Sequence, residues 1–449
     1  PPTAEIRVSP DCHDGAMSSE SRSPRHFRRR SSFRLGTALL AGRTAALASR
    51  LTGRGSGASI GGRVTTRLDP RAFAELIASR RIAAVTGTNG KTTTTHLLTA
   101  AIRNGLGDDG SQVVTNADGA NLHHGIVSTL GRSLHAPVAI LETDERVVAD
   151  TVRLGHPEIL VLLNFSREQS DHNHEMAFLG RDWRAALAAA GPDGPMVIAS
   201  SADPLIVWVC QRARAVVWVD TNPRWTADST LCPNCGGVLI RETTRWHCPD
   251  CPLSQPEADW WVDGDEAVSR KGDRHRLDLQ LPGHFNLTNA TCALAAAVEI
   301  GISPDDALAG MRTVASPAGR YATAIVSGTT VQLLLANNPA SWTECLPLAV
   351  SDPLVLAIDA AAGDGRDLSW LWDVDFGELT GRTVICSGPR ALDLAVRLDY
   401  SGIDHVVIED LEEALDSPLL DGHWDAGHPI DVLSSSTPFQ KLRQLGGLA

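Results

Sequence analysis

The feature that most constrains this chain is an apolar run that ends in glycines, a lysine and threonines. The run at residues 81–85 leads directly into Thr86, Gly87, Thr88, Asn89, Gly90, Lys91, Thr92 and Thr93. Glycines let backbone N–H groups crowd around phosphate oxygens, a lysine adds a compact positive charge, and the hydroxyl after it can ligate Mg²⁺. The stretch therefore predicts a strand, a phosphate loop and a helix that bind ATP.

Apolar runs continue after this loop and alternate with helical stretches. They lie at residues 112–115, 138–142, 159–164, 196–199 and 215–219. Strands separated by helices predict a parallel sheet that is covered on both faces, with ligands at the carboxyl ends of its strands. Glu142 ends one of these runs, so it can face a nucleotide-bound Mg²⁺ together with Thr92. A solvated acidic turn is the alternative for Glu142.

Four cysteines form two pairs with metal-ligand spacing. Cys232 and Cys235 make one Cys-x₂-Cys knuckle, and Cys248 and Cys251 make a second one twelve residues later. Four thiolates on two tight turns suit tetrahedral Zn²⁺ and leave no open position for a substrate, so the zinc should be structural. The other five of the nine cysteines lack such spacing, and we expect them to be free thiols.

Composition excludes several classes of protein. With 449 residues the chain should hold two or three domains, and its net charge of −13 argues against general nucleic-acid binding. No run of eighteen apolar residues and no signal-peptide layout occur, so the expected location is the cytoplasm. A reducing compartment also suits the cysteine pattern.

The beginning of the chain is different in character. Residues 1–34 are rich in Pro, Ser and Arg, and we expect them to be disordered. Residues 33–51 show leucines at helical spacing with arginines between them, which predicts an amphipathic helix. Its arginines allow contact with a membrane surface, which would place the chain at the inner face of the membrane. Packing against the chain's own domain is the favoured alternative.

The second half of the chain contains another Asn-containing helix start and a second set of strands. Asn286 and Asn289 open an Ala-rich helical stretch, where Asn286 could simply cap the helix. Beyond it, short apolar runs at 331–335, 354–358, 383–386 and 405–408 alternate with helices. This pattern predicts a second open α/β sheet of Rossmann-like type.

These motifs resemble those of the Mur ligases, which build the peptide stem of bacterial cell-wall precursors. The loop at 86–93 is similar to their ATP loop, and in that setting the resemblance makes Glu142 a magnesium ligand. It also implies that Asn286 and Asn289 meet the adenine side of ATP and that Arg320 reaches a phosphate. Glu168 stands where the family usually has Asp, and it is a candidate for the metal or ammonia site.

The match narrows to the MurT subfamily, the ligase subunits of lipid II isoglutaminyl synthase. Residues 335–340 and 364–376 carry this closer resemblance, although Asn337 replaces the usual Lys. The resemblance implies a central P-loop ATPase domain at 35–319, with a zinc ribbon inserted at about 228–255, and a C-terminal domain at 320–449. Members of the subfamily lack a UDP-binding front domain and work with a GatD-type glutaminase subunit. They lend that partner an aspartate, here Asp364 or Asp367.

The resemblance implies an ATP-dependent carbon-nitrogen ligase that amidates the D-glutamate α-carboxylate of lipid II through an acyl phosphate. Lys91 would neutralise charge during phosphoryl transfer, and the partner would supply ammonia. Two alternatives stay open. One is a Mur or folylpolyglutamate type of ligase that adds an amino acid, and the other is a non-catalytic zinc-ribbon scaffold switched by nucleotide. Cys386 lacks the preceding Gly of a nucleophile elbow, which argues against glutaminase activity in this chain.

Overall fold

The structure is a computed structural model. It describes residues 33–51, 58–117, 119–167, 176–242, 245–315, 321–361, 364–422 and 429–448. Helix α1 begins at Phe33, one residue before the predicted end of the N-terminal tail. The expected sites at Glu168 and Arg320 lie outside the described residues.

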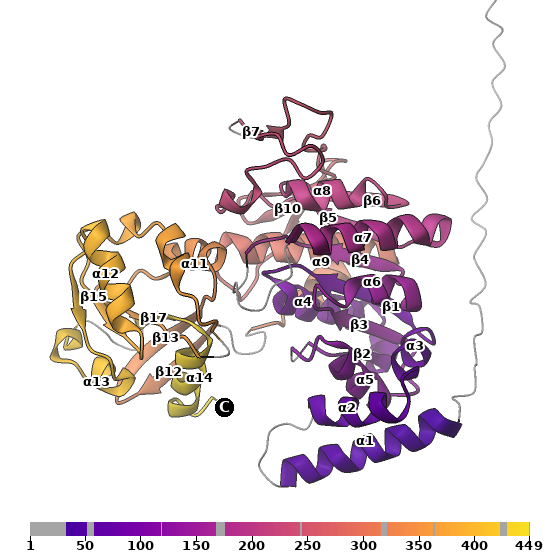
Figure 1. Cartoon of the computed structure of the whole chain (residues 1–449), viewed down its shortest axis with the longest axis horizontal. Helices are drawn as coiled ribbons and strands as arrows, with labels where there is room; N and C mark the ends of the chain where they lie inside the picture. The colour runs from indigo at the N-terminus through magenta and orange to yellow at the C-terminus, as the bar shows by residue number, and fades with distance from the viewer. Residues whose placement is uncertain are drawn as a thin grey trace, which may run out of the picture. The chain divides into compact units, whose positions relative to one another are not determined.

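A mostly parallel sheet organises the central part of the chain, with the strand order β11-β10-β9-β6-β5-β4-β1-β3-β2 (Figure 1). Its strands are β1 Arg81–Thr86, β2 Val113–Thr115, β3 Val138–Glu142, β4 Ile159–Leu162, β5 Met196–Ser200, β6 Ala215–Asp220, β9 Trp260–Asp263, β10 Glu266–Ser269 and β11 Arg274–Arg276. Strands β1 to β6 within it pair in parallel, whereas β9, β10 and β11 pair antiparallel at one edge. Strand β1 lies between β4 and β3, where the direction of strand succession reverses. Such a switch point opens a crevice for ligands.

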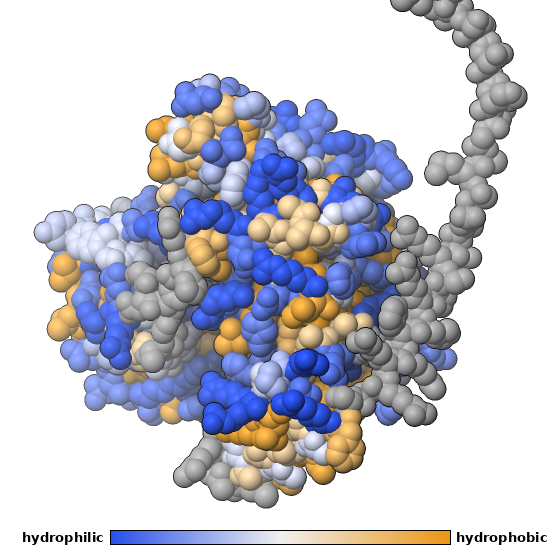
Figure 2. Space-filling view, turned by 45° about the vertical axis from the view of Figure 1, so that its right-hand side comes forward, coloured by the Kyte–Doolittle hydropathy of each residue, from blue (hydrophilic) through white to orange (hydrophobic). Residues whose placement is uncertain are grey.

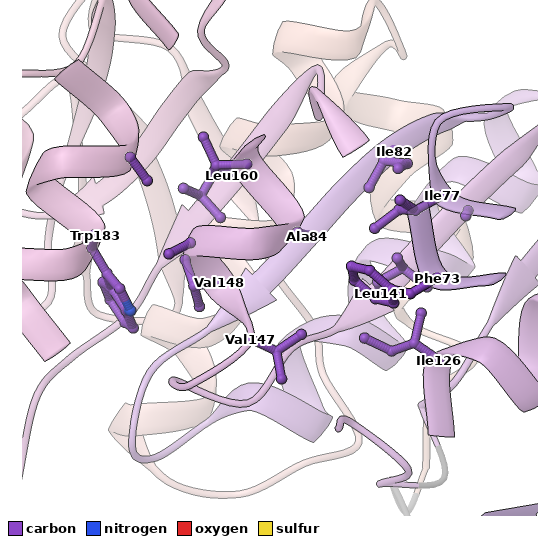
Figure 3. Packing of buried hydrophobic residues seen from close by; sticks show 14 of the residues in the cluster. Phe73, Ile77, Ile82, Ala84, Ile126, Leu141, Val147, Val148, Leu160 and Trp183 are labelled. Atoms are coloured by element: carbon purple, nitrogen blue, oxygen red, sulfur yellow. The ribbon is translucent and has the colours of Figure 1, made fainter. Parts of the chain in front are cut away.

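Helices cover both faces of this sheet. They are α3 Ala72–Ile77, α4 Lys91–Gly105, α5 His123–Arg132, α6 Val148–Asp150, α7 Met176–Ala190, α8 Pro204–Cys210, α9 His284–Ile300 and α10 Pro304–Met311. Alternate residues of β1 enter opposite cores: Ile82 and Ala84 pack with α3, α5 and α7, while Ala83 and Val85 pack with α4, α9 and α10. Figure 3 shows the first core, where strand side chains meet Phe73, Ile77, Ile126 and Trp183. The predicted doubly covered α/β sheet is confirmed.

The first two helices of the described chain pack through glycines. Helix α1 spans Phe33–Leu51 and lies beside α2, which spans Ala58–Leu68 (Figure 1). A Cβ atom on Gly42 of α1 would lie 2.6 Å from the carbonyl oxygen of Gly61 of α2, and a Cβ on Gly62 would overlap the carbonyl oxygen of His124 in α5. The two helices therefore reach the domain by backbone-to-backbone contact that side chains would prevent.

The C-terminal part contains a second sheet with the order β12-β13-β17-β14-β15-β16. Its elements are β12 Tyr321–Val326, β13 Thr329–Leu335, α11 Pro339–Cys345, β14 Leu354–Ala357, β15 Val384–Ser387, α12 Ala391–Ser401, β16 His405–Val407, α13 Leu411–Leu415, β17 Ile430–Ser434 and α14 Ser436–Leu445. All neighbours except β12 and β13 pair in parallel. Separate clusters of buried side chains line its two faces. The predicted second α/β sheet is confirmed.

The glycine contact predicts a stability difference between two substitutions. Gly62→Ala should lower the free energy of unfolding by about 1–3 kcal/mol, because the added methyl group overlaps the His124 carbonyl oxygen. Gly36→Ala is the matched control, since its Cβ would meet nothing within 4 Å and alanine favours a helix by about 1 kcal/mol. Urea unfolding of both variants measures this, and equal stability of the two would contradict the packing described.

Candidate functional site

The loop between β1 and α4 has the backbone of a phosphate cradle. Gly87 has a φ of +139° and Gly90, which precedes α4, has a φ of +87°, and L side chains rarely adopt either conformation. A Cβ on Gly90 would also lie 2.5 Å from Oδ1 of Asn289. Both glycines are therefore needed for the turn that aims the first N–H groups of α4 at one point. Such a point attracts anions.

Lys91 folds back over this loop. Its Nζ donates to the Gly87 carbonyl oxygen at 2.7 Å and forms an ion pair of 2.7 Å with Oε1 of Glu145. Each of the two side chains is 10% exposed, and the indole of Trp183 donates to the Glu145 carbonyl oxygen at 2.8 Å. Glu145 lies three residues after the end of β3. Sequence spacing gives no sign of its pairing with Lys91.

One predicted magnesium ligand ends β3, and the other lies in the first turn of α4, the helix that follows β1. Glu142 ends β3, and the pairing of Val85 with Glu142 places this strand end next to the phosphate loop. The Glu142 carboxylate is buried and accepts a 2.9 Å hydrogen bond from Nδ2 of Asn121. Thr92, in the first turn of α4, is also buried. A carboxylate and a hydroxyl are oxygen donors of the kind Mg²⁺ prefers, so these residues fit the ion.

Asn164 supports the loop from the other side. The N–H of Thr88 donates to its carbonyl oxygen at 2.9 Å. Its side chain accepts from the N–H of Asn89 at 2.9 Å and donates to the Asn89 carbonyl oxygen at 3.0 Å. Because Asn164 follows β4, both neighbours of β1 contribute to the site. Asn164 ends the predicted apolar run at 159–164 and was not among the predicted site residues.

A cavity of about 200 Å³ opens beside the loop and is lined by Asn286 and Asn289 of α9. The residue that caps α9 is Gly283, not Asn286, and Nδ2 of Asn286 donates to the Pro282 carbonyl oxygen at 2.6 Å. Oδ1 of Asn286 is buried and has no hydrogen-bond partner within the described residues. A ligand with an amino group, such as adenine, supplies the missing donor. This unpaired acceptor therefore fits the predicted adenine side.

The C-terminal part also lines this cavity, through Tyr321, Ala340, Ser341 and Glu344. Asn338 caps α11, and its amide pairs with that of Asn89 at 3.0 and 3.4 Å. The Asn337 side chain accepts from the Ser436 hydroxyl at 3.1 Å. The cavity thus lies between the phosphate loop, α9 and α11.

The two aspartates considered for the partner differ in exposure. Asp364 is 2% exposed and its Oδ1 accepts from the N–H of Thr437 at 2.9 Å. Asp367 is exposed, and its Oδ1 accepts from the N–H of Ser369 at 2.9 Å. A second protein can reach Asp367 without rearrangement of the chain, whereas Asp364 is covered.

The four cysteines of the ribbon converge as predicted. Their Sγ atoms all lie within 4.8 Å of one another, and the Cys232–Cys251 and Cys235–Cys248 pairs are 3.6 and 3.5 Å apart. Zn–S bonds of about 2.3 Å give tetrahedral edges of about 3.8 Å, so the cage fits Zn²⁺. The two-stranded ribbon of β7 Ile240–Arg241 and β8 Trp246–His247 belongs to this insertion.

Trp246 joins the ribbon to the central domain. It is buried with Val207 of α8, and its indole N–H donates to the Ser201 carbonyl oxygen at 3.2 Å.

The remaining described cysteines are buried, and burial raises the pKa of Cys292, Cys345 and Cys386 to about 12. Protonated, enclosed thiols are poor nucleophiles. Within the described residues, no helix is both long and apolar enough to cross a bilayer.

Comparisons with known proteins agree with this fold. Residues 85–207 match the Mur ligase middle domain, and residues 335–437 match the MurT ligase C-terminal domain. A pseudomurein peptide ligase type C from Methanothermus fervidus superposes with a TM-score of 0.61 at 16% identity, covering 83% of this chain and 79% of that one. MurF from Acinetobacter baumannii gives a TM-score of 0.60 at 17% identity, covering 87% and 80%.

The fold, the phosphate loop and the match to the Mur ligase middle domain support an ATP-dependent ligase. Two curated relatives extend the likeness over most of its length. The lipid II isoglutaminyl synthase (glutamine-hydrolyzing) subunit MurT of Staphylococcus aureus is 27% identical over 83% of this chain and 89% of the relative. The MurT subunit of Streptococcus pneumoniae is 26% identical over 81% and 86%. The chain thus combines a Mur ligase middle domain with a C-terminal domain of the MurT type.

The ribbon predicts one zinc ion per chain that supports folding. Removing two thiolates with Cys235→Ser and Cys248→Ser should abolish zinc binding, because two ligands cannot complete a tetrahedral site. Metal analysis of the purified chain measures this, and the melting temperature should fall with the zinc content. Cys292→Ala, at a buried thiol outside the ribbon, is the control and should retain zinc. Full zinc content in the double variant would contradict the assignment.

Proposed function

We propose that the chain amidates the α-carboxylate of D-glutamate in the stem peptide of lipid II, using ATP and ammonia from a GatD-type glutaminase. The observation that carries this proposal is the presence of a phosphate cradle and a MurT-type C-terminal domain in one chain. The relatives with this combination are named as subunits of a glutamine-hydrolysing lipid II isoglutaminyl synthase. Because these relatives are subunits of a larger enzyme, we expect a partner for this chain, and a glutaminase partner would supply the ammonia.

The first chemical step is activation of the carboxylate. A carboxylate oxygen attacks the γ-phosphorus of ATP, ADP leaves, and the product is an acyl phosphate. Negative charge spreads over the transferred group, and positive groups fixed beside it lower the barrier. Lys91 can supply that charge, since its ammonium already lies over the loop at Gly87. Mg²⁺, held by Thr92 and Glu142, would neutralise further phosphate charge.

The second step replaces oxygen by nitrogen. Ammonia attacks the acyl carbon, phosphate leaves with the bonding electron pair, and the nitrogen loses a proton to give the amide. Ammonia is mostly protonated at neutral pH, so delivery from a bound glutaminase raises the concentration of the reactive form at the site. Glu168 remains the predicted residue for the metal or ammonia site.

The cavity supports nucleotide binding on the side away from the phosphates. Asn286 offers a buried acceptor, and Asn289 lies against Gly90, so α9 can hold the base while α4 holds the phosphates. An α/β ligase that adds an amino acid would share this nucleotide site. The nitrogen donor therefore distinguishes the two functions, and incubation with ATP, lipid II and ammonium is the direct test. Amidated lipid II supports the proposal, whereas ADP release that requires an added amino acid overturns it.

Loss of the buried ammonium predicts loss of catalysis. Lys91→Ala should lower ATP-dependent amidation by about 10³-fold or more, because a group that stabilises the transferring phosphoryl is removed. Lys271→Ala is the control, since Lys271 is exposed and lies outside the site. Mass spectrometry of lipid II measures the product. If the Lys91 variant lost ATP binding but amidated lipid II at an unchanged rate, the catalytic role would be contradicted. The nucleotide would then act only as a switch.

The exposure of Asp367 predicts a selective defect. Asp367→Asn should reduce glutamine-dependent amidation by the complex and leave ammonium-dependent amidation intact, because only the partner's glutaminase uses this carboxylate. Asp375→Asn is a matched control, since Asp375 is also exposed and also accepts from the N–H two residues ahead, at 2.9 Å. If Asp364→Asn gave the selective defect at an unchanged melting temperature, the covered aspartate would be the one that serves the partner.

A further inference from the structure

Helix α1 has an apolar face on each side. Leu35 and Leu39 are buried in the core that also holds residues of α3 and α5. On the opposite side, Phe33, Leu40 and Leu47 are 89%, 65% and 58% exposed. Because these three residues are seven apart, they lie nearly in line along the helix. A stripe of this kind differs from single exposed apolar residues, which are common on soluble proteins.

Positive charge surrounds this stripe. Arg34, Arg43 and Arg50 of α1 are exposed, and helical geometry places Arg34 on one side of the stripe and the other two on its opposite side. Helix α2 adds exposed Arg63 and Arg67. Residues 33–68 contain six arginines and no Asp, Glu or Lys, whereas the whole chain has a net charge of −13. The next residue, Asp69, is buried and lies 3.9 Å from Arg34, so it offsets only part of this charge.

Helix α2 also adds apolar surface, since Ile60 and Leu68 are 37% and 48% exposed. In Figure 2, hydrophobic residues and strongly hydrophilic residues gather together at the lower end of the molecule, where α1 and α2 lie in Figure 1. The two helices are therefore a layer, here called the α1–α2 layer and comprising residues 33–51 and 58–68, in which apolar and basic side chains are exposed side by side.

We propose that the α1–α2 layer binds the surface of an anionic lipid bilayer. A helix with an exposed apolar stripe and basic flanks lies in the plane of the interface, with its apolar side chains among the acyl chains. Arginine side chains extend along such a surface and place their guanidinium groups among the lipid phosphates. Because α1 is fixed to the domain by Leu35 and Leu39, the stripe is available without unfolding of the helix.

The charge distribution favours this occupant over a second copy of the chain. In a two-fold symmetric contact, the same surface meets itself, so the arginines beside the two stripes would approach one another. Like charges brought together in this way oppose association, whereas anionic lipid neutralises them. The inference concerns binding alone and does not depend on the reaction proposed above.

Sedimentation of the full chain with vesicles tests the proposal. The chain should bind vesicles of phosphatidylglycerol and phosphatidylcholine, bind pure phosphatidylcholine weakly, and be released by salt. Leu40→Gln and Leu47→Gln should each weaken partitioning roughly ten-fold or more, because each removes a leucine side chain from the acyl region. Arg50→Gln should weaken it about five-fold, and Arg50→Lys should restore binding. These variants leave the basic run at 28–30 unchanged, so a loss is attributable to α1.

Matched controls come from another helix. Leu392→Gln and Val396→Gln replace residues of α12 that are 60% and 48% exposed, and they should bind as the unaltered chain does. Equal binding to neutral and anionic vesicles would overturn the proposal. So would unaltered vesicle binding by the Leu40 and Leu47 variants. A concentration-dependent dimer that these variants abolish, with no vesicle binding by the unaltered chain, would assign the stripe to a second copy.

Discussion

The site depends on the interactions that hold the buried ammonium group of Lys91 over the phosphate loop. Moving an unpaired charge out of water is costly, so Lys91 can be enclosed only where other groups balance it. The Gly87 carbonyl oxygen and the Glu145 carboxylate do this, each at 2.7 Å from Nζ. The pair is held in turn by Trp183, whose indole fixes the backbone at Glu145. Positive charge is therefore fixed over the phosphate loop before any phosphate arrives.

The sheet explains why the other groups of the site converge there. Strand β1 has β3 on one side and β4 on the other, so the carboxyl ends of three strands meet at one place. Each strand end contributes a different group to the site: β1 leads into the glycine loop, β3 ends at Glu142, and Asn164 follows β4. Asn164 bonds to both the N–H and the carbonyl oxygen of Asn89, so the loop conformation is fixed by a neighbouring strand and not by its own residues alone.

Much of the fold and of the candidate site could be predicted from the sequence, because these features depend on residues close together in the chain. The phosphate loop and the four ribbon cysteines are short patterns in which residue type and spacing determine the geometry. Strands β1, β3 and β4 followed from apolar runs. By contrast, β17 and the antiparallel edge strands β9 to β11 were not predicted, because each has at most three consecutive apolar residues and its pairing depends on the sheet beside it. The role of Asn286 was ambiguous for a related reason. The sequence allowed it to be either the cap of α9 or an acceptor for a ligand, and the structure shows that Gly283 is the cap.

The contacts that sequence analysis missed are the long-range ones. Glu145 lies 54 residues from Lys91, and Asn338 lies 249 residues from Asn89, so no spacing rule connects either pair. The Asn89–Asn338 contact is also weak. A neutral amide pair contributes only about 1 kcal/mol per hydrogen bond, and the partly exposed bridges from Arg167 to Asp373 and from Arg224 to Glu378 contribute less. Among the described residues, polar contacts of this modest strength connect the two sheets around the cavity. A nucleotide that displaces the amide pair therefore loses little, while it gains the cradle of α4, the charge of Lys91 and the free acceptor of Asn286.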